Sequence, residues 1–374
     1  MGEENYREAD RASGTGPGND SAPGEINAKK AAEMLGLGWN LGNSYDCHGT
    51  WFDNVRMETA WGNPIVTRDL IHFVAQTGFS TVRVPVTWYM HMDENGVIAE
   101  DWLKRVRRTV RMILAEGMCC ILDCKHDCGA MVSYGGGWIQ ATRENFTKNR
   151  ERVQRMITQI ASCFAEEPQT LLFEGLSECM NAECEQFMPS QEETEVVNDW
   201  NQLFVDAVRA TGGNNAVRNL IVTPYASGAT PYLLSGFRVP KDTAENRLLL
   251  GVHLYVPLGF TSRAATWARQ TDEFDCLCEE ELERAFDDIV SGAEPFGLPV
   301  VITEFGAMDR SNTPERARYC GCVVDFAHSR GIPCMYWDDG KGYEVIRRAE
   351  REVRFPGIVA AMMTAERLTP SRLF

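Results

Sequence analysis

The chain alternates short apolar runs of strand length with longer segments in which apolar residues recur every three or four positions. The short runs are bounded by turn-forming residues, which is typical of buried strands. The longer segments, such as 101–117 and 149–167, have the period of amphipathic helices. Two helices are expected to end at Gly117 and Gly331. Strands are predicted at residues 37–42, 80–88, 119–126, 170–178, 219–225, 248–255, 299–305 and 333–339.

The number of strand–helix units selects the fold class. Eight units favour a closed parallel barrel, whereas six would suit a doubly wound open sheet. Because no internal segment rich in Pro, Gly or Ser divides the chain, we predict an α/β fold with a single (β/α)8 TIM barrel over residues 27–374. Residues 1–26 are polar and rich in Gly, Asp, Glu and Ser, and are expected to form a disordered leader.

Length and charge narrow the classes of function. The chain has 374 residues, of which 44% are hydrophobic, so it can bury a large core. Its formal net charge of -16 argues against nucleic acid or an anionic membrane as a partner and suits a neutral ligand. No apolar run reaches the roughly 18 residues of a membrane span. The leader also lacks the apolar stretch of a signal peptide.

The thirteen cysteines are an odd number, so at least one thiol has no disulfide partner within the chain. Most of them lie in apolar runs such as "MCCILDC", and we therefore expect buried, reduced thiols. Cys124, His126 and Cys128 are a weaker alternative as a metal site, because zinc usually takes a fourth ligand or an open water position.

Polar side chains gather where the predicted strands end. Catalytic residues of a parallel barrel lie at the carboxyl ends of its strands, so these positions should meet around one cleft. Glu178 ends the fourth strand and Glu304 the seventh. Glycoside hydrolysis needs two such carboxylates, one to give a proton and one to attack the anomeric carbon or activate water. The alternative is that each glutamate forms an ordinary salt bridge with Arg or Lys.

Six stretches in chain order resemble glycoside hydrolase family 5, in its cellulase-like endoglucanase branch. They are "GWNLGNSYD", "ETAWGNP", "TGFSTVRVPVTW", "GVHLYVPLGF", "VVITEFGA" and "YWDDG". The resemblance spans residues 35 to 340 and implies a barrel that hydrolyses β-1,4-linked or mixed-linkage glucan with retention of anomeric configuration. It implies no metal and no organic cofactor. Family members are often secreted, whereas the chain taken as complete would be cytoplasmic. A monomer is expected.

The same resemblance implies roles for individual residues. Glu304 would be the nucleophile, and Glu178 the acid/base. Arg83 and Tyr255 would keep Glu304 ionised and oriented, since hydrogen bonds to a charged form favour it. His253 would lie against Glu178 and assist its proton cycling. Packing or bracing of the core is the alternative for Arg83 and Tyr255.

Tryptophans are the expected sugar platforms. Trp337, in "YWDDG", would stack on a sugar face, as flat aromatic rings do well. Packing is its alternative role. Trp61, Trp88 and Trp138 are equally compatible with the outer groove and with the core.

Two positions depart from the family pattern. The residue before the acid/base is normally asparagine, which reaches the sugar 2-hydroxyl, but here it is Ser177. The third strand normally ends in a His-His pair, whereas "DCKHD" has Lys125 and then His126. An ammonium within about 4–6 Å of a carboxylate lowers its pKa, whereas a general acid needs its pKa raised. We therefore expect a weakened or retuned hydrolase.

Two other functions remain open at this stage. The first is a catalytically impaired barrel that binds a glycan without cleaving it. The second is different chemistry, in which Lys125 forms a Schiff base in an apolar barrel mouth. Both glutamates are retained, and this favours hydrolysis over the other two.

Overall fold

A computed structural model describes residues 26–49, 54–128, 137–182, 188–263 and 267–368. The predicted leader lies outside the described residues apart from Ile26. Among the described helices, none combines the length and apolarity that crossing a bilayer requires.

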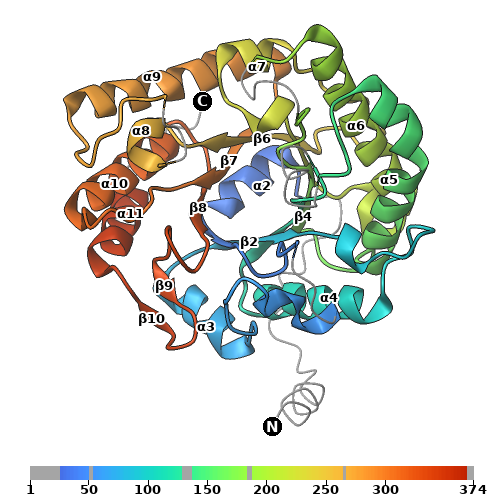
Figure 1. The fold of residues 1–374 in the computed structure, drawn as a ribbon, viewed down its shortest axis with the longest axis horizontal. Coiled ribbons are helices and arrows are strands. Elements are labelled where there is room, and N and C mark those ends of the chain that lie inside the picture. Colours follow the sequence, from blue (N-terminus) through green and yellow to red (C-terminus); the bar gives the residue numbers. More distant parts are fainter. Residues whose placement is uncertain (1–25, 50–53, 129–136, 183–187, 264–266, 369–374) are drawn as a thin grey trace.

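All eight predicted strands are present, each somewhat shorter than its prediction. They pair in parallel and in chain order, and β8 closes the barrel against β1 (Figure 1). The (β/α)8 barrel is thus confirmed. The strands are β1 (Leu37–Leu41), β2 (Thr81–Val86), β3 (Cys119–Cys124), β4 (Leu171–Leu176), β5 (Leu220–Val222), β6 (Leu248–Leu254), β7 (Val300–Phe305) and β8 (Cys334–Asp338).

Helices surround the barrel and pack their apolar faces on it (Figure 1). Their ends follow local chemistry: Ser190 and Glu193 form a capping box at the start of α6, and Gly117 and Gly331 take positive φ beyond α4 and α10. The helices are α2 (Ala28–Leu35), α3 (Arg68–Thr77), α4 (Glu100–Ala115), α5 (Arg143–Cys163), α6 (Gln191–Arg209), α7 (Pro231–Ser235), α8 (Leu258–Thr261), α9 (Cys276–Ala293), α10 (Thr313–Ser329) and α11 (Pro356–Leu368).

Short elements complete the described chain. They are the 3₁₀ helices η2 (Asn54–Thr59), η3 (Tyr89–His91), η5 (Gly213–Ala216), η6 (Tyr225–Ser227) and η7 (Glu294–Phe296), and the antiparallel pair β9 (Ile346–Arg347) and β10 (Glu352–Val353).

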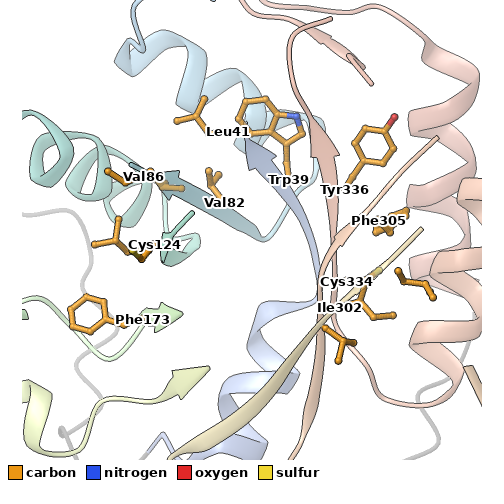
Figure 2. Close-up of a cluster of buried hydrophobic side chains, with 14 of the residues drawn as sticks. Trp39, Leu41, Val82, Val86, Cys124, Phe173, Ile302, Phe305, Cys334 and Tyr336 are labelled. Atoms are coloured by element: carbon orange, nitrogen blue, oxygen red, sulfur yellow. The ribbon is translucent and has the colours of Figure 1, made fainter. Parts of the chain in front are cut away.

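The apolar core has two parts. The larger part lies between the strands and the outer helices, where side chains such as Trp39, Phe305 and Tyr336 point away from the barrel axis (Figure 2). The smaller part fills the amino-terminal end of the barrel, where α2 packs Ala31 and Leu35 against inward side chains of the strands. One end of the barrel is therefore closed by α2, and the polar strand tips lie at the other end.

Candidate active site

Both strands that lead to the predicted catalytic glutamates contain a bulge. Asp123 and Cys124 of β3 pair with Glu174 and Leu176 of β4, so β4 has one extra residue. β7 likewise has one extra residue relative to β6, because Val252 pairs with Ile302 and the next residue, His253, pairs with Glu304. Bulges bend a strand and re-aim its side chains, and they are frequent beside active sites. Here each bulge changes the side of the sheet to which the following side chains point, shortly before each glutamate.

Glu304 is buried among hydrogen-bond donors. Its Oε1 accepts from Arg83 Nη1 at 2.8 Å and from Lys125 Nζ at 2.5 Å, and its Oε2 accepts from the Tyr255 hydroxyl at 3.0 Å. Burial alone would raise the pKa of Glu304, but the charges of His253 and Lys125 beside it lower that pKa to about 2. The site thus keeps Glu304 as an anion.

Glu178 is held more openly. Its backbone has a φ of 55°, in the left-handed region, and its amide donates to the Ser227 hydroxyl at 2.9 Å. A non-glycine residue in this region is strained, and such strain is common at functional sites. The Glu178 carboxylate lies 3.0 Å from His253 Nδ1 and 3.1 Å from Lys125 Nζ. Burial acts to raise the pKa of Glu178, but Lys125 and His253 hold it well below its usual range.

The Lys125 ammonium therefore bridges both glutamates. Burial acts to lower the pKa of Lys125, but the two carboxylates raise it above its ordinary value. The ammonium also lies 5.2 Å from the centre of the Trp337 ring, within cation–π range. A Schiff base needs a neutral amine, so this environment counts against that role for Lys125.

The two carboxylates are close enough to act on one atom. One oxygen of Glu178, one of Glu304 and a ring nitrogen of His253 all lie within 4.8 Å of one another. Within the described ranges this is the one cluster with metal-binding geometry, so Cys124, His126 and Cys128 do not form one. A divalent cation among these groups would lie beside the fixed charge of Lys125. The arrangement therefore suits an ammonium-bridged carboxylate pair better than a metal ion.

Arg83 is wholly buried and contacts one member of this pair, Glu304. Besides Glu304, its guanidinium donates to Asp123 at 2.7 Å and to Glu174 at 2.5 Å, and also to the Asn40 amide oxygen at 2.9 Å. Burial raises the pKa of Asp123 well above its usual range, although Arg83 opposes this effect. Sequence reasoning missed Asp123 and Glu174, although a charged residue within an apolar strand run was a signal for both.

Ser177 and His126 are both held by contacts within the protein. Ser177 is wholly buried, and its hydroxyl accepts from Arg83 Nη2 at 3.2 Å. His126 has Nδ1 2.8 Å from the Asp46 carbonyl oxygen, and its ring packs against Trp61. Burial and the Lys125 charge lower the pKa of His126 to about 4, so its ring is neutral near pH 7. Direct sugar contacts by Ser177 and His126 remain predictions.

The four tryptophans differ in their burial. Trp88 is buried in the core, whereas Trp337, Trp61 and Trp138 are partly exposed. Trp138 donates to Asp127 at 2.7 Å, and so this side chain is anchored at the barrel mouth. The twelve described cysteines form no disulfide with one another, and nine of them are buried, which agrees with the predicted burial of most thiols.

Comparison with known proteins agrees with this geometry. The family model for cellulase (glycosyl hydrolase family 5) matches residues 45–342. Endoglucanase A of Ruminococcus albus is 31% identical over 85% of this chain and 86% of that protein. Endoglucanase A of Clostridium longisporum is also 31% identical, over 83% of this chain, but the match spans only 59% of its length.

A solved structure shows the same fold. A glycoside hydrolase family 5 enzyme from Prevotella bryantii B14 superposes with a TM-score of 0.83 at 32% identity, covering 91% of this chain and 98% of that one. The barrel, the two glutamates at the ends of its fourth and seventh strands, and the family match over most of the chain lead to one assignment. The chain belongs to glycoside hydrolase family 5.

Proposed function

We propose that the protein is a retaining endo-β-glucanase that hydrolyses β-1,4-linked or mixed-linkage glucan by a two-glutamate double displacement. The observation that carries this proposal is the short reach between the Glu178 and Glu304 carboxylates, within 4.8 Å for one oxygen of each. Retaining enzymes hold their carboxyl groups about 5–5.5 Å apart, whereas inverting enzymes leave about 6.5–9.5 Å for a water molecule.

The surroundings of Glu304 suit a nucleophile. Its carboxylate is kept charged by Arg83 and oriented by Tyr255, and it needs no proton transfer before attack. Attack on the anomeric carbon forms a glycosyl ester while the glycosidic bond breaks and Glu178 gives a proton to the departing oxygen. Glu178 then accepts a proton from the water that cleaves this ester. Glu178 is about one-third exposed, so water can reach it.

The substrate class is supported by neighbours in the family. A family 5 lichenase from Caldicellulosiruptor was solved as a mutant with cellotetraose, and it is 30% identical to this chain with a TM-score of 0.84. The Prevotella bryantii enzyme was solved as a mutant with a xyloglucan tetradecasaccharide. In this chain, the partly exposed Trp337 ring offers the flat apolar surface on which a glucosyl ring stacks.

We expect activity on glucan to be weakened or retuned. The ammonium of Lys125 opposes protonation of Glu178, and the buried Ser177 hydroxyl is turned to Arg83. Loss of one oriented active-site donor can cost about 10²–10³ in rate. A protein that binds a glycan without cleaving it is the second candidate, favoured by the contact of Lys125 with both carboxylates.

The test is hydrolysis of barley β-glucan and of carboxymethylcellulose, with reducing ends and the anomer first released measured by proton NMR. Wild type should release the β-anomer first, and Glu304→Gln should abolish release. Release of the α-anomer would contradict retention. Glucan binding without release from about pH 4 to about pH 8, a range spanning ordinary carboxyl and imidazole pKa values, would favour the binding protein.

A further inference from the structure

The first step of a double displacement normally takes a proton from the acid/base. The proton goes to the glycosidic oxygen as that oxygen leaves, and such positioned proton transfer contributes typically 10²–10⁴-fold in rate. In this site the group expected to supply the proton, Glu178, has the ammonium of Lys125 3.1 Å from one oxygen and His253 Nδ1 3.0 Å from the other. Both contacts favour the ionised carboxylate, which has no proton to give.

The chemistry of the first step strengthens the contact with Lys125. As Glu304 forms an ester, its negative charge disappears, and Lys125 keeps Glu178 as its one anionic partner within bonding distance in the described site. Arg83 and Asp123 also act on the ammonium, but these two groups are bonded to each other. Glu178 therefore stays ionised through the first step. This state suits the second step, in which Glu178 takes a proton from water.

We propose that this site prefers β-glycosides whose leaving group departs as a stable anion, such as β-cellobiosides of acidic phenols, over the alcohol leaving groups of glucan chains. The inference rests on the proposed retaining mechanism and names the substrate class that the site handles best. Lys125 acts through Glu178, so it is a positioning residue that sets this selectivity.

Displacement of a phenolate by Glu304 needs no proton donor. A Glu304 oxygen forms a bond to the anomeric carbon, and the bond from that carbon to the phenol oxygen breaks with its electron pair on the phenolate. Water then attacks the anomeric carbon, Glu178 accepts one proton from it, and the ester bond returns its electrons to Glu304. An alkoxide leaving group is too basic to follow the same route.

The experiment measures kcat/KM near pH 7 for dinitrophenyl, para-nitrophenyl and phenyl β-cellobioside. Wild type should show a steep fall along this series. Glu178→Gln should slow turnover of dinitrophenyl cellobioside, because the second step loses its base, and should lower kcat/KM for the phenyl substrate by far less than the about 10²–10⁴-fold that loss of a working proton donor costs. In a Lys125→Met background the series should flatten, and Glu178→Gln should then cost about 10²-fold or more with the phenyl substrate.

Lys104→Met is the matched control, since Lys104 lies exposed on α4 and pairs only with Glu100 among the ion pairs seen there. It should change neither the series nor the effect of Glu178→Gln. A flat series in wild type, or a loss of about 10²-fold with phenyl cellobioside on Glu178→Gln alone, would overturn the inference while leaving the hydrolase intact. No turnover of any of the three glycosides would overturn the hydrolase itself, and the inference with it. If Lys125→Met does not fold, the inference is still tested by the substrate series of wild type and by the effect of Glu178→Gln in a chain that keeps Lys125.

Discussion

The two glutamates at the barrel mouth are held by different surroundings. Glu304 is buried, and both of its oxygens accept hydrogen bonds, two of them from the cations Arg83 and Lys125. Glu178 is about one-third exposed on a strained backbone, and its oxygens face His253 and Lys125. Despite this difference, the pKa of each glutamate is lowered, and Lys125 contributes to both shifts.

An acid and a nucleophile normally have surroundings that push their pKa values apart. The surroundings of Glu304 match the role of a nucleophile, which must be charged. Those of Glu178 match only the second half of its role, as a base. This site is therefore built around one permanent anion and a second carboxylate that is kept from becoming an acid. Three changes test this difference between the two glutamates.

The largest effect is expected from Arg83→Met. The change leaves three buried carboxylates, on Asp123, Glu174 and Glu304, without their shared cation. Stability should fall by about 3–5 kcal/mol, as for other broken buried ion pairs, and glucan hydrolysis should fall by about 10³-fold or more because the nucleophile loses a charged donor. Thermal unfolding and initial rates measure the two losses.

The stability of the Arg83→Met variant should also depend on pH. Carboxyls left without a cation in the fold bind protons more tightly than in the unfolded chain, so the variant should regain stability as the pH falls. Arg105→Met is the control, because Arg105 is also buried and, in the described part of the chain, forms an ion pair with one carboxylate, that of Glu58. It should lose less stability than Arg83→Met. A loss under about 1 kcal/mol for Arg83→Met would contradict the network, since a broken buried pair costs more than that.

The second effect is on the pH profile. The charged and titratable groups around Glu178 include Lys125, His253, Glu304, Tyr255 and His126. The pKa of Glu178 lies well below its usual range. The protonated fraction of Glu178 therefore grows about tenfold for each pH unit on approach to that pKa from above. Hydrolysis of glucan should rise by about 10²-fold between about pH 7 and about pH 5. Hydrolysis of dinitrophenyl cellobioside should stay flat across that range.

Stability limits how far this gain extends. Burial lowers the pKa of His126 to about 4 and that of His91 to about 3. Because the unfolded chain binds protons on histidine near pH 6.5, stability should decrease as the pH falls below about 6.5 through about 4. Rates should therefore be paired with melting curves at each pH. A glucan profile that peaks near pH 7 in fully folded protein would contradict a Glu178 that is kept ionised.

The sequence could predict much of the barrel, because eight apolar runs alternating with helical periods leave few other topologies. The sequence also predicts Glu178, Glu304, Arg83, His253, Tyr255 and Lys125 at strand ends, and the structure brings these side chains together. The predicted position of Arg83 was wrong, because this residue lies inside β2 and only its long side chain reaches the others. The possible approach of Lys125 to Glu178 was predictable from their places on neighbouring strands. Its second contact, with Glu304, was not.

Bulges explain part of what the sequence could not predict. Strict alternation would put Leu176 on the same face as Glu174, but Leu176 belongs to the apolar core outside the barrel. Alternation would likewise put Ile302 and Glu304 on one face of β7. Ile302 belongs to the core outside the barrel, however, and Glu304 points to the catalytic site. Alternation fixes facing only while the register holds. Which of several nearby carboxylates Arg83 or Lys125 contacts depends on distances of a few ångströms, which a pattern of residue types does not contain.

The smallest of the three effects is the gain expected from restoring the family pattern with Lys125→His and Ser177→Asn together. The first change removes the ammonium from Glu178. The second supplies an amide that can still accept from Arg83 and can also donate toward a sugar hydroxyl, a contact that the buried serine hydroxyl does not offer. Glucan hydrolysis should rise by at least about 10-fold from the restored transition-state contacts.

The two single variants show which glutamate carries this gain. Lys125→His alone should give most of it, because Ser177→Asn alone leaves Glu178 paired with the ammonium. Turnover of dinitrophenyl cellobioside should change little with Lys125→His alone, since its leaving group needs no proton. A flat or reduced glucan rate in a folded double variant would show that Lys125 and Ser177 are not what restrains the site. An equal gain on both substrates would place the effect outside proton donation, either at Glu304 or at the sugar contact supplied by Ser177→Asn, because both speed the two leaving groups alike.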